Sequence, residues 1–481
     1  MNDAAAVSIF QRLLQFKTVS QTGHLDGAND ACVAFLRATI AEQLPGAVIT
    51  VLPGPVESKP VLLATWAGSE PSLPSLLLNS HYDVVPVMEE HWTQPAWGGV
   101  KVSSDEFGAL GPRIYGRGAQ DMKSVCAQYI VALSRLAASG WTPRRNIHLT
   151  FVPDEEVGGS GMAYLLTHPA WPALNVGCAL DEGLCSGPSA GADGFTVFYG
   201  ERTPWWMTVR AEGPTGHGSR FIRGTATHVL HAWLARALSF RKEQEAELIA
   251  SAASADDSRS GCSHAKCKKL GDVTTVNLTV LEAGVTCDGG ATYSINVIPT
   301  SARASLDVRV PVTVPHAELA ARFDSWCREA ETEWDATPGT ISWTWAEEAG
   351  GTPLQAHYVS STDATNPWWT TLNGACAAEG KMLSKEIFPA GTDSRLLRAL
   401  NICAFGFSPL NRDPILLHEH DECVGLCALS TSSLSLSLSL SLFLFLFLSS
   451  YAPLFSFSSA LMQVRVGKSL RGRRGALCKD H

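Results

Sequence analysis

Two residues that could bind or orient a metal ion follow a short apolar run near position 80. Residues 76 to 87 read LLLNSHYDVVPV, which places His81 and Asp83 two positions apart. An apolar run of this length predicts a strand buried on both faces of a parallel sheet. In open α/β sheets, functional groups lie just past the carboxyl ends of such strands. A hydrogen-bonded pair near a turn would use the same residues, so this motif alone does not decide between them.

The same order, an apolar segment and then acidic residues or histidine, recurs four more times. NIHLTFVP, VGCAL and PILLHEHDE each lead into such residues, and RIYGRGAQDMK places Asp121 ahead of an amphipathic helix that Gly140 ends. There are five such clusters, and the first and the last contain histidine. Together they supply the imidazoles and carboxylates that bind hard or borderline cations. The residues concerned are His81, Asp121, Asp154, Glu155, Glu156, Asp181, Glu182, His418 and His420.

These side chains exceed the needs of one catalytic zinc, which uses three protein ligands and an open position. They suffice for two metals, about 3.5–4 Å apart and bridged by one carboxylate, with a shared water as the nucleophile. The consecutive glutamates Glu155 and Glu156 can then divide the work. One binds metal, while the other takes the proton from the water and passes it to the leaving group.

Seven motifs, in this order, resemble the co-catalytic zinc aminoacylases and carboxypeptidases, a family of metallopeptidases. They are SHYDVVPV, YGRGAQDMK, FVPDEEVGG, ALDEG, TVFYGERTPWW, GHGSRF and LLHEHDE, and the resemblance runs from about residue 5 to 422. It implies an α/β fold: a catalytic domain with a mixed, mostly parallel sheet flanked by helices, plus an inserted α+β lid and dimerisation domain.

The resemblance also implies a role for each motif residue. Two Zn²⁺ ions per subunit are expected, one held by His81 and Glu182 and the other by Glu156 and His418. Asp121 would bridge the two ions, Glu155 would be the general base, and Asp83 would orient the imidazole of His81. His420 resembles a neighbour of the last ligand rather than a ligand.

The implied domain order is a catalytic domain over residues 1–199 and 351–428, interrupted by the lid over 200–350. His217, in GHGSRF, would reach the active site of the partner subunit and stabilise the oxyanion of the tetrahedral intermediate. A lone loop histidine is otherwise usually a solvated side chain. The resemblance therefore implies a homodimer.

The implied reaction is hydrolysis of N-acyl-L-amino acids to a carboxylate and a free amino acid. Arg309 and Arg395 are the candidates for binding the substrate carboxylate, with Asn277 and Thr392 as hydrogen-bonding support. Either arginine could instead form a structural ion pair. A dipeptidase or carboxypeptidase of the same family is the alternative activity.

Composition narrows the class of protein. The 481 residues are 45% hydrophobic and 17% charged with a net charge of −9, which argues against nucleic acid and anionic membranes as partners. Thirteen scattered cysteines, together with a start that lacks a secretory pattern, predict a reduced, cytoplasmic protein. The segment CSHAKC, residues 262–267, is interpreted as a surface loop rather than a zinc knuckle.

The sequence departs from the family pattern in three places. Residues 251–270 and 287–294 look like inserted surface loops, and from about residue 423 the resemblance stops. Residues 429–481, which begin with alternating Ser and Leu, are predicted to be a disordered low-complexity tail. Translated non-coding sequence explains this tail better than an aggregation-prone strand or a weak membrane anchor. A catalytically silent product with a defective C-terminus is thus a second hypothesis.

Overall fold

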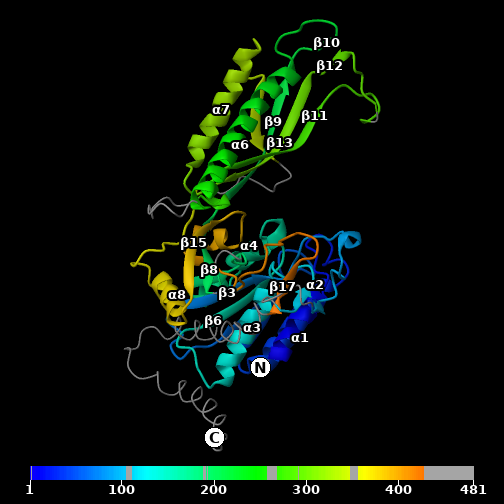
Figure 1. Cartoon of the computed structure of the whole chain (residues 1–481). Coiled ribbons are helices and arrows are strands. Elements are labelled where there is room, and N and C mark those ends of the chain that lie inside the picture. Colours follow the sequence, from blue (N-terminus) through cyan, green and yellow to red (C-terminus); the bar gives the residue numbers. More distant parts are fainter. Residues whose placement is uncertain are drawn as a thin grey trace, which may run out of the picture.

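An eight-stranded sheet forms the base of the molecule, in the order β1-β2-β6-β3-β7-β16-β8-β15 (Figure 1). The computed structural model describes residues 1, 3–103, 111–187, 191, 193–256, 268–290, 292–346 and 356–426. Strands β6, β3, β7 and β16 run parallel at the centre of the sheet. The bounds of the eight strands are β1 Val48–Leu52, β2 Val61–Trp66, β3 Ser75–His81, β6 Ile147–Val152, β7 Val176–Asp181, β8 Gly194–Glu201, β15 Met382–Phe388 and β16 Cys403–Gly406.

Helices cover both faces of this sheet. On β3, Leu76 and Leu78 pack with the helices α1, α2 and α3, whereas Leu77 packs with α4 and α9. Both faces of the strand are therefore buried, as its continuous apolar run predicts. The helices of this part are α1 Asp3–Leu14, α2 Ala28–Gln43, α3 Lys123–Ala138, α4 Ser160–Thr167, α5 Trp171–Leu174, α8 Pro367–Ala378 and α9 Ser394–Ala399, with short 3-10 turns η1 Glu89–His91 and η3 Glu155–Val157. The predicted fold class is confirmed.

A second unit extends away from the large sheet, at the top of Figure 1. It is an antiparallel sheet in the order β11-β13-β9-β14, with α6 and α7 packed on one face. Alternate residues Trp205, Met207 and Val209 of β9 point into that helical layer. We propose that this unit is the lid predicted for residues 200–350. Its elements are β9 Thr203–Glu212, β10 Gly216–His217, α6 Ala226–Asp256, η5 Leu270–Asp272, β11 Thr275–Ala283, β12 Val297–Ile298, β13 Ser301–Val310, α7 His316–Glu333 and β14 Ile341–Trp345.

A small sheet, β17-β5-β4, secures the last described residues. Strand β17 (Cys423–Gly425) pairs with β5 (Arg113–Tyr115), which also pairs with β4 (Val100–Val102). The N–H of Leu426 donates to the carbonyl of Pro112 at 2.6 Å. The chain is therefore anchored up to residue 426.

Two details differ from the sequence-based expectations. Residues 414–417, before His418, form a loop rather than a strand, because the side chain of Gln120 bonds to the backbone of Pro414 and Leu416. The first part of the 251–270 insertion is helical, since α6 continues to Asp256.

Of the second insertion, residues 287–290 and 292–293 are exposed, as expected of a surface loop. The segment CSHAKC and the tail 429–481 lie outside the described residues. Among the residues that are described, no helix is long and apolar enough to cross a membrane.

Candidate metal centre

Three neighbouring strands of the large sheet deliver candidate ligands to one edge. His81 is the last residue of β3, η3 with Glu155 and Glu156 follows β6, and Glu182 follows β7. Strands β6, β3 and β7 are adjacent and parallel, so their carboxyl ends meet at the same edge. The predicted position beyond the strand ends is where these side chains lie.

His81 sits at the buried end of the cluster. Its Nε2 lies 3.0 Å from Oδ1 of Asp121 and 2.9 Å from Oε2 of Glu182. Its Nδ1 lies 3.0 Å from the carbonyl oxygen of Asp83 and 3.4 Å from Oδ1 of the same residue. Contacts to Nδ1 leave Nε2 as the atom aimed at Asp121 and Glu182.

His418 closes the cluster from the opposite side. Its Nε2 lies 3.0 Å from Oε2 of Glu156 and 3.3 Å from Oδ2 of Asp121. Asp121 thus presents one oxygen to each imidazole. The His418 side chain is 51% exposed while that of His81 is fully buried, so solvent and substrate reach the cluster from the His418 side.

The donor set fits divalent cations. Ligand atoms of His81, Asp121 and Glu156 lie within 4.8 Å of one another, and so do those of His81, Glu155 and Glu182. The buried Oε1 of Glu156 has no hydrogen-bond partner among the described residues. A buried carboxylate oxygen without a partner is costly unless a cation binds it. Imidazole and carboxylate together suit zinc, and also cobalt or manganese.

The residues of the cluster shift one another's pKa values. Burial disfavours the charged imidazole of His81, but hydrogen bonds to Asp121, Asp83 and Glu182 raise its pKa well above the ordinary value. Hydrogen bonds to Asp121 and Glu156 raise the pKa of His418 to about 10. Burial and the charge of Asp121 raise the pKa of Glu156 to about 7.

Metal binding at pH 7.5 is therefore expected to release protons. The raised pKa values of His81 and His418 favour protonated imidazoles in the metal-free protein at this pH, and a metal takes the nitrogen in its neutral form. Burial and the charge of Asp121 also raise the pKa of Glu182 well above its ordinary value, so at least about two protons should leave. Titration calorimetry of zinc into the chelated protein, in buffers of different ionisation enthalpy, measures this number. An observed enthalpy that does not depend on the buffer would contradict the arrangement.

Asp83 does more than the predicted orientation of His81. Its carboxylate accepts hydrogen bonds from the Ser20 hydroxyl at 2.7 Å and from the backbone N–H groups of Glu155 and Glu156 at 3.1 and 3.3 Å. One buried carboxylate therefore fixes the imidazole and also the turn η3, which carries both glutamates.

Glu422 is a residue whose role the sequence did not reveal. Its fully buried carboxylate accepts from the Arg117 guanidinium at 2.8 Å and from the N–H groups of Gly118, Gln120 and Asp121 at 3.0, 2.6 and 3.2 Å. Arg117 also donates to the carbonyl oxygen of His418 at 3.2 Å. The loops of Asp121 and His418 are thus joined through one ion pair. Its place directly after the HEHD sequence was the only available signal.

Replacing Glu422 should loosen the centre without removing a ligand. In Glu422→Gln the amide NH₂ faces backbone N–H donors, and Arg117 loses its buried partner. We expect about 10- to 100-fold weaker zinc binding, as for other residues that orient metal ligands. Titration calorimetry measures it, with Glu419→Gln, an exposed glutamate three positions earlier, as the matched control. Equal zinc affinities in the two variants would refute this role.

Asp393 is a second residue without a predicted role. It is buried, neither carboxylate oxygen has a hydrogen-bond partner among the described residues, and Glu155 lies within range of its charge. Burial and Asp181 raise the pKa of Asp393 to about 7. Next to it, Arg395 donates to the carbonyl oxygens of Thr392 and Gly158 at 2.6 and 2.8 Å. The charges of Glu155 and Glu182 act on Arg395, which places its guanidinium near the centre.

The other predicted substrate-binding residues have partners of their own. The hydroxyl and N–H of Thr392 donate to Glu201 at 2.6 and 2.9 Å. Arg309 forms a bidentate ion pair with Asp307 on β13, at 2.7 and 2.9 Å. Asn277, across from Asp307 on β11, accepts from Arg241 at 3.4 Å. His217, on β10, lies at the end of the lid far from the large sheet (Figure 1).

Comparison with known proteins shows which protein family this chain belongs to. The model of peptidase family M20/M25/M40 matches residues 77–433. The chain belongs to this family. Aminoacylase-1 of Mus musculus is 41% identical over 423 residues, covering 87% of this chain and 90% of the relative. Aminoacylase-1 of Dictyostelium discoideum is 43% identical over 365 residues, 76% of this chain and 81% of the relative. The resemblance of the motifs to this family is confirmed, and with it the enzyme class, a metal-dependent hydrolase.

Solved structures agree on the fold. The M20 metallo-carboxypeptidase Sso-CP2 of Sulfolobus solfataricus has a TM-score of 0.62 at 16% identity, covering 93% of this chain and 99% of that chain. A dinuclear metal-binding peptidase of family M20 from Bacillus subtilis has a TM-score of 0.60 at 14% identity, with the same coverage. At these identities the likeness concerns the fold alone.

Proposed function

We propose that this protein is a zinc-dependent amidohydrolase that cleaves N-acyl-L-amino acids into a carboxylate and a free L-amino acid. The observation that carries the proposal is the convergence of two imidazoles and three carboxylates from five separate segments, with Asp121 between the two imidazoles. The aminoacylase-1 relatives, at about 40% identity over most of the chain, favour an acyl amino acid over a dipeptide as the substrate. We assign two zinc ions per subunit and a cytoplasmic location.

Each residue of the centre has a task in this proposal. His81 and Glu182 would hold one ion, Glu156 and His418 the other, and Asp121 both. Bound ions of this kind polarise the amide carbonyl and lower the pKa of a water.

Glu155 would move the proton. Its ligand atom lies within 4.8 Å of those of His81 and Glu182, close enough to take a proton from the attacking water. Burial and the charge of Glu182 raise the pKa of Glu155 well above the ordinary value, which favours proton acceptance near neutral pH. The same carboxylic acid then donates that proton to the departing amine nitrogen.

Arg395 and Arg309 would bind the substrate carboxylate. Arg395 uses one hydrogen on each outer nitrogen for Thr392 and Gly158, which leaves further N–H donors. The guanidinium of Arg309 is already paired with the carboxylate of Asp307, so the substrate carboxylate would have to share this guanidinium with Asp307. Asn277, in the lid, and Thr392, in the catalytic part, would support the arginines with hydrogen bonds to the substrate.

A homodimer would bring His217 to an active site. Its Nδ1 accepts the N–H of Ser219 at 3.2 Å, which places the proton of the neutral ring on Nε2. An outward Nε2–H is suited to stabilising the oxyanion of a partner subunit's substrate. The fully exposed Phe221 and Ile295 near His217 and the edge strand β11 are surfaces that a second subunit would cover.

Hydrolysis of N-acetyl-methionine by the full chain tests this function. We expect activity that disappears on chelation, returns with zinc, and exceeds the activity on a dipeptide. Activity restricted to the dipeptide would favour the peptidase alternative. No activity with zinc bound would favour the catalytically silent product.

A further inference from the structure

Two cysteines form a pair on adjacent strands away from the metal centre. Cys178 on β7 and Cys403 at the start of β16 are register partners in a parallel pairing. Register partners point to the same face, and neighbouring strands lie about 4.7–4.9 Å apart, inside the Cα separation that disulfides tolerate. The Cys178 thiol donates a hydrogen bond to the carbonyl oxygen of Ala179 at 3.7 Å, and its side chain interacts with that of Cys403.

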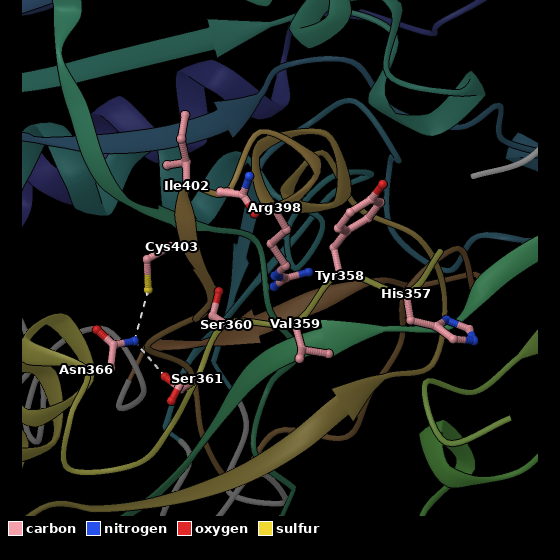
Figure 2. Close-up of a pocket in the computed structure, with 10 residues that line it drawn as sticks. His357, Tyr358, Val359, Ser360, Ser361, Asn366, Arg398, Ile402 and Cys403 are labelled. Carbon is pink, nitrogen blue, oxygen red and sulfur yellow. Dashed lines mark hydrogen bonds between the residues drawn. The ribbon is translucent and has the colours of Figure 1, made fainter. Parts of the chain in front are cut away.

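Cys403 lines a cavity whose lining does not include Cys178. Cys403 lines a pocket of about 340 Å³, formed by residues 357–361, Asn366, Arg398, Asn401 and Ile402 (Figure 2). Cys403 is partly exposed there, whereas Cys178 is fully buried. A reagent that enters the pocket therefore meets the sulfur of Cys403 first.

The pocket stabilises a negative charge on that sulfur. The amide of Asn366 donates to Sγ of Cys403 at 3.4 Å, and the same amide is held by the carbonyl of Ser361 (Figure 2). Arg398, only 4% exposed, is fixed by the carbonyl oxygens of Ala404 and Phe198. Its Nη1 has no hydrogen-bond partner among the described residues and lies 3.7 Å from Glu201.

The thiols of this chain differ accordingly in acidity. The interaction with the Cys178 side chain is the main cause that lowers the pKa of Cys403 to about 7, aided by Asn366 and Ser360 and opposed by burial. In contrast, burial raises the pKa of Cys32, Cys185 and Cys376 to about 12. A thiolate is the nucleophile in thiol chemistry, so Cys403 is set apart from the other buried cysteines.

We propose that Cys403 and Cys178 are a redox-active pair that reacts with low-molecular-weight disulfides entering this pocket. The Cys403 thiolate attacks one sulfur of the disulfide, which forms a mixed disulfide and expels one thiolate. Cys178 then attacks the sulfur of Cys403 and passes its proton to the departing thiolate of the small molecule. The products are a Cys178–Cys403 disulfide and a second released thiol, so two protein thiols are oxidised and one small disulfide is reduced to two thiols.

The test uses the full, reduced chain with oxidised glutathione as the probe. Peptide mapping over time should first find a glutathionyl group on Cys403 and then a Cys178–Cys403 cross-link. In Cys178→Ser the mixed disulfide should persist on Cys403 without a cross-link, and in Cys403→Ser neither product should form. Cys287→Ser, which removes an exposed cysteine of the lid, should leave the wild-type pattern. Modification that begins elsewhere, or a cross-link without Cys403, would overturn the proposal.

A measurement on the unmutated protein guards against variants that fail to fold. Iodoacetamide labelling at pH 7 should modify Cys403 at least about tenfold faster than Cys32, Cys185 or Cys376, because about half of Cys403 is thiolate at that pH whereas burial keeps the other three thiols protonated. Labelling of Cys403 no faster than that of these three would contradict the pair.

Discussion

The variant Glu155→Gln should retain its metal and lose about 10²- to 10⁴-fold in kcat on N-acetyl-methionine. The amide has the shape of the carboxylate and keeps the N–H bond from residue 155 to Asp83, but it cannot carry a proton between the water and the leaving nitrogen. Initial rates at saturating substrate measure kcat, and metal analysis of the same samples measures occupancy. Glu57→Gln, an exposed glutamate elsewhere, should match the wild type.

The melting temperature distinguishes this loss of activity from unfolding of the variant. The folded-state pKa of Glu155 lies above the unfolded value, so in the metal-free protein this group destabilises the fold as pH rises through its unfolded pKa. A neutral glutamine removes that penalty at pH 7. The melting temperature of metal-free Glu155→Gln should therefore equal or exceed that of the wild type. Loss of zinc from a variant whose metal-free melting temperature is not lowered would mean that Glu155 is a ligand instead of the base.

Asp121→Asn should remove more metal than any other single substitution in the centre. Each oxygen of Asp121 faces one imidazole, whereas the other candidate ligands face one side only. Loss of charge stabilisation worth several kcal/mol corresponds to an activity loss of at least about 10³-fold. Metal content after dialysis against a weak chelator measures the effect.

Two further variants show whether the loss of metal is specific to Asp121. His418→Ala should weaken only the outer position and keep about one ion per chain, since His81 and Glu182 are untouched. Asp30→Asn, an exposed aspartate on α2, should keep the wild-type content. If Asp121→Asn binds as much zinc as Asp30→Asn, Asp121 does not bridge.

The sequence predicts that candidate ligands lie at one edge of the sheet because its signals are local. Each strand of the parallel core reads as an apolar run, and the residue after the run falls at the carboxyl edge whatever the rest of the fold does. His81, Glu155 and Glu182 were predictable for this reason. The roles given to each of them rested on the resemblance of the motifs.

What the sequence missed depends on contacts between distant segments. The bonds of Glu422 to Arg117 and Asp121 join positions about 300 residues apart, which no local pattern encodes. The apolar residues before His418 look like a strand, yet their backbone bonds to a side chain from another loop. The extension of α6 to Asp256 differs from the loop that the polar residues from Ser251 onward predict, because the alanines among them favour a helix.

Anomalous scattering at the zinc edge, from crystals of the full chain grown with zinc, tests the central claim most directly. The account predicts two peaks, one adjacent to His81 and Glu182 and one adjacent to His418 and Glu156, with Asp121 contacting both. Crystals with bound zinc but no peak between residues 81 and 418 would contradict it.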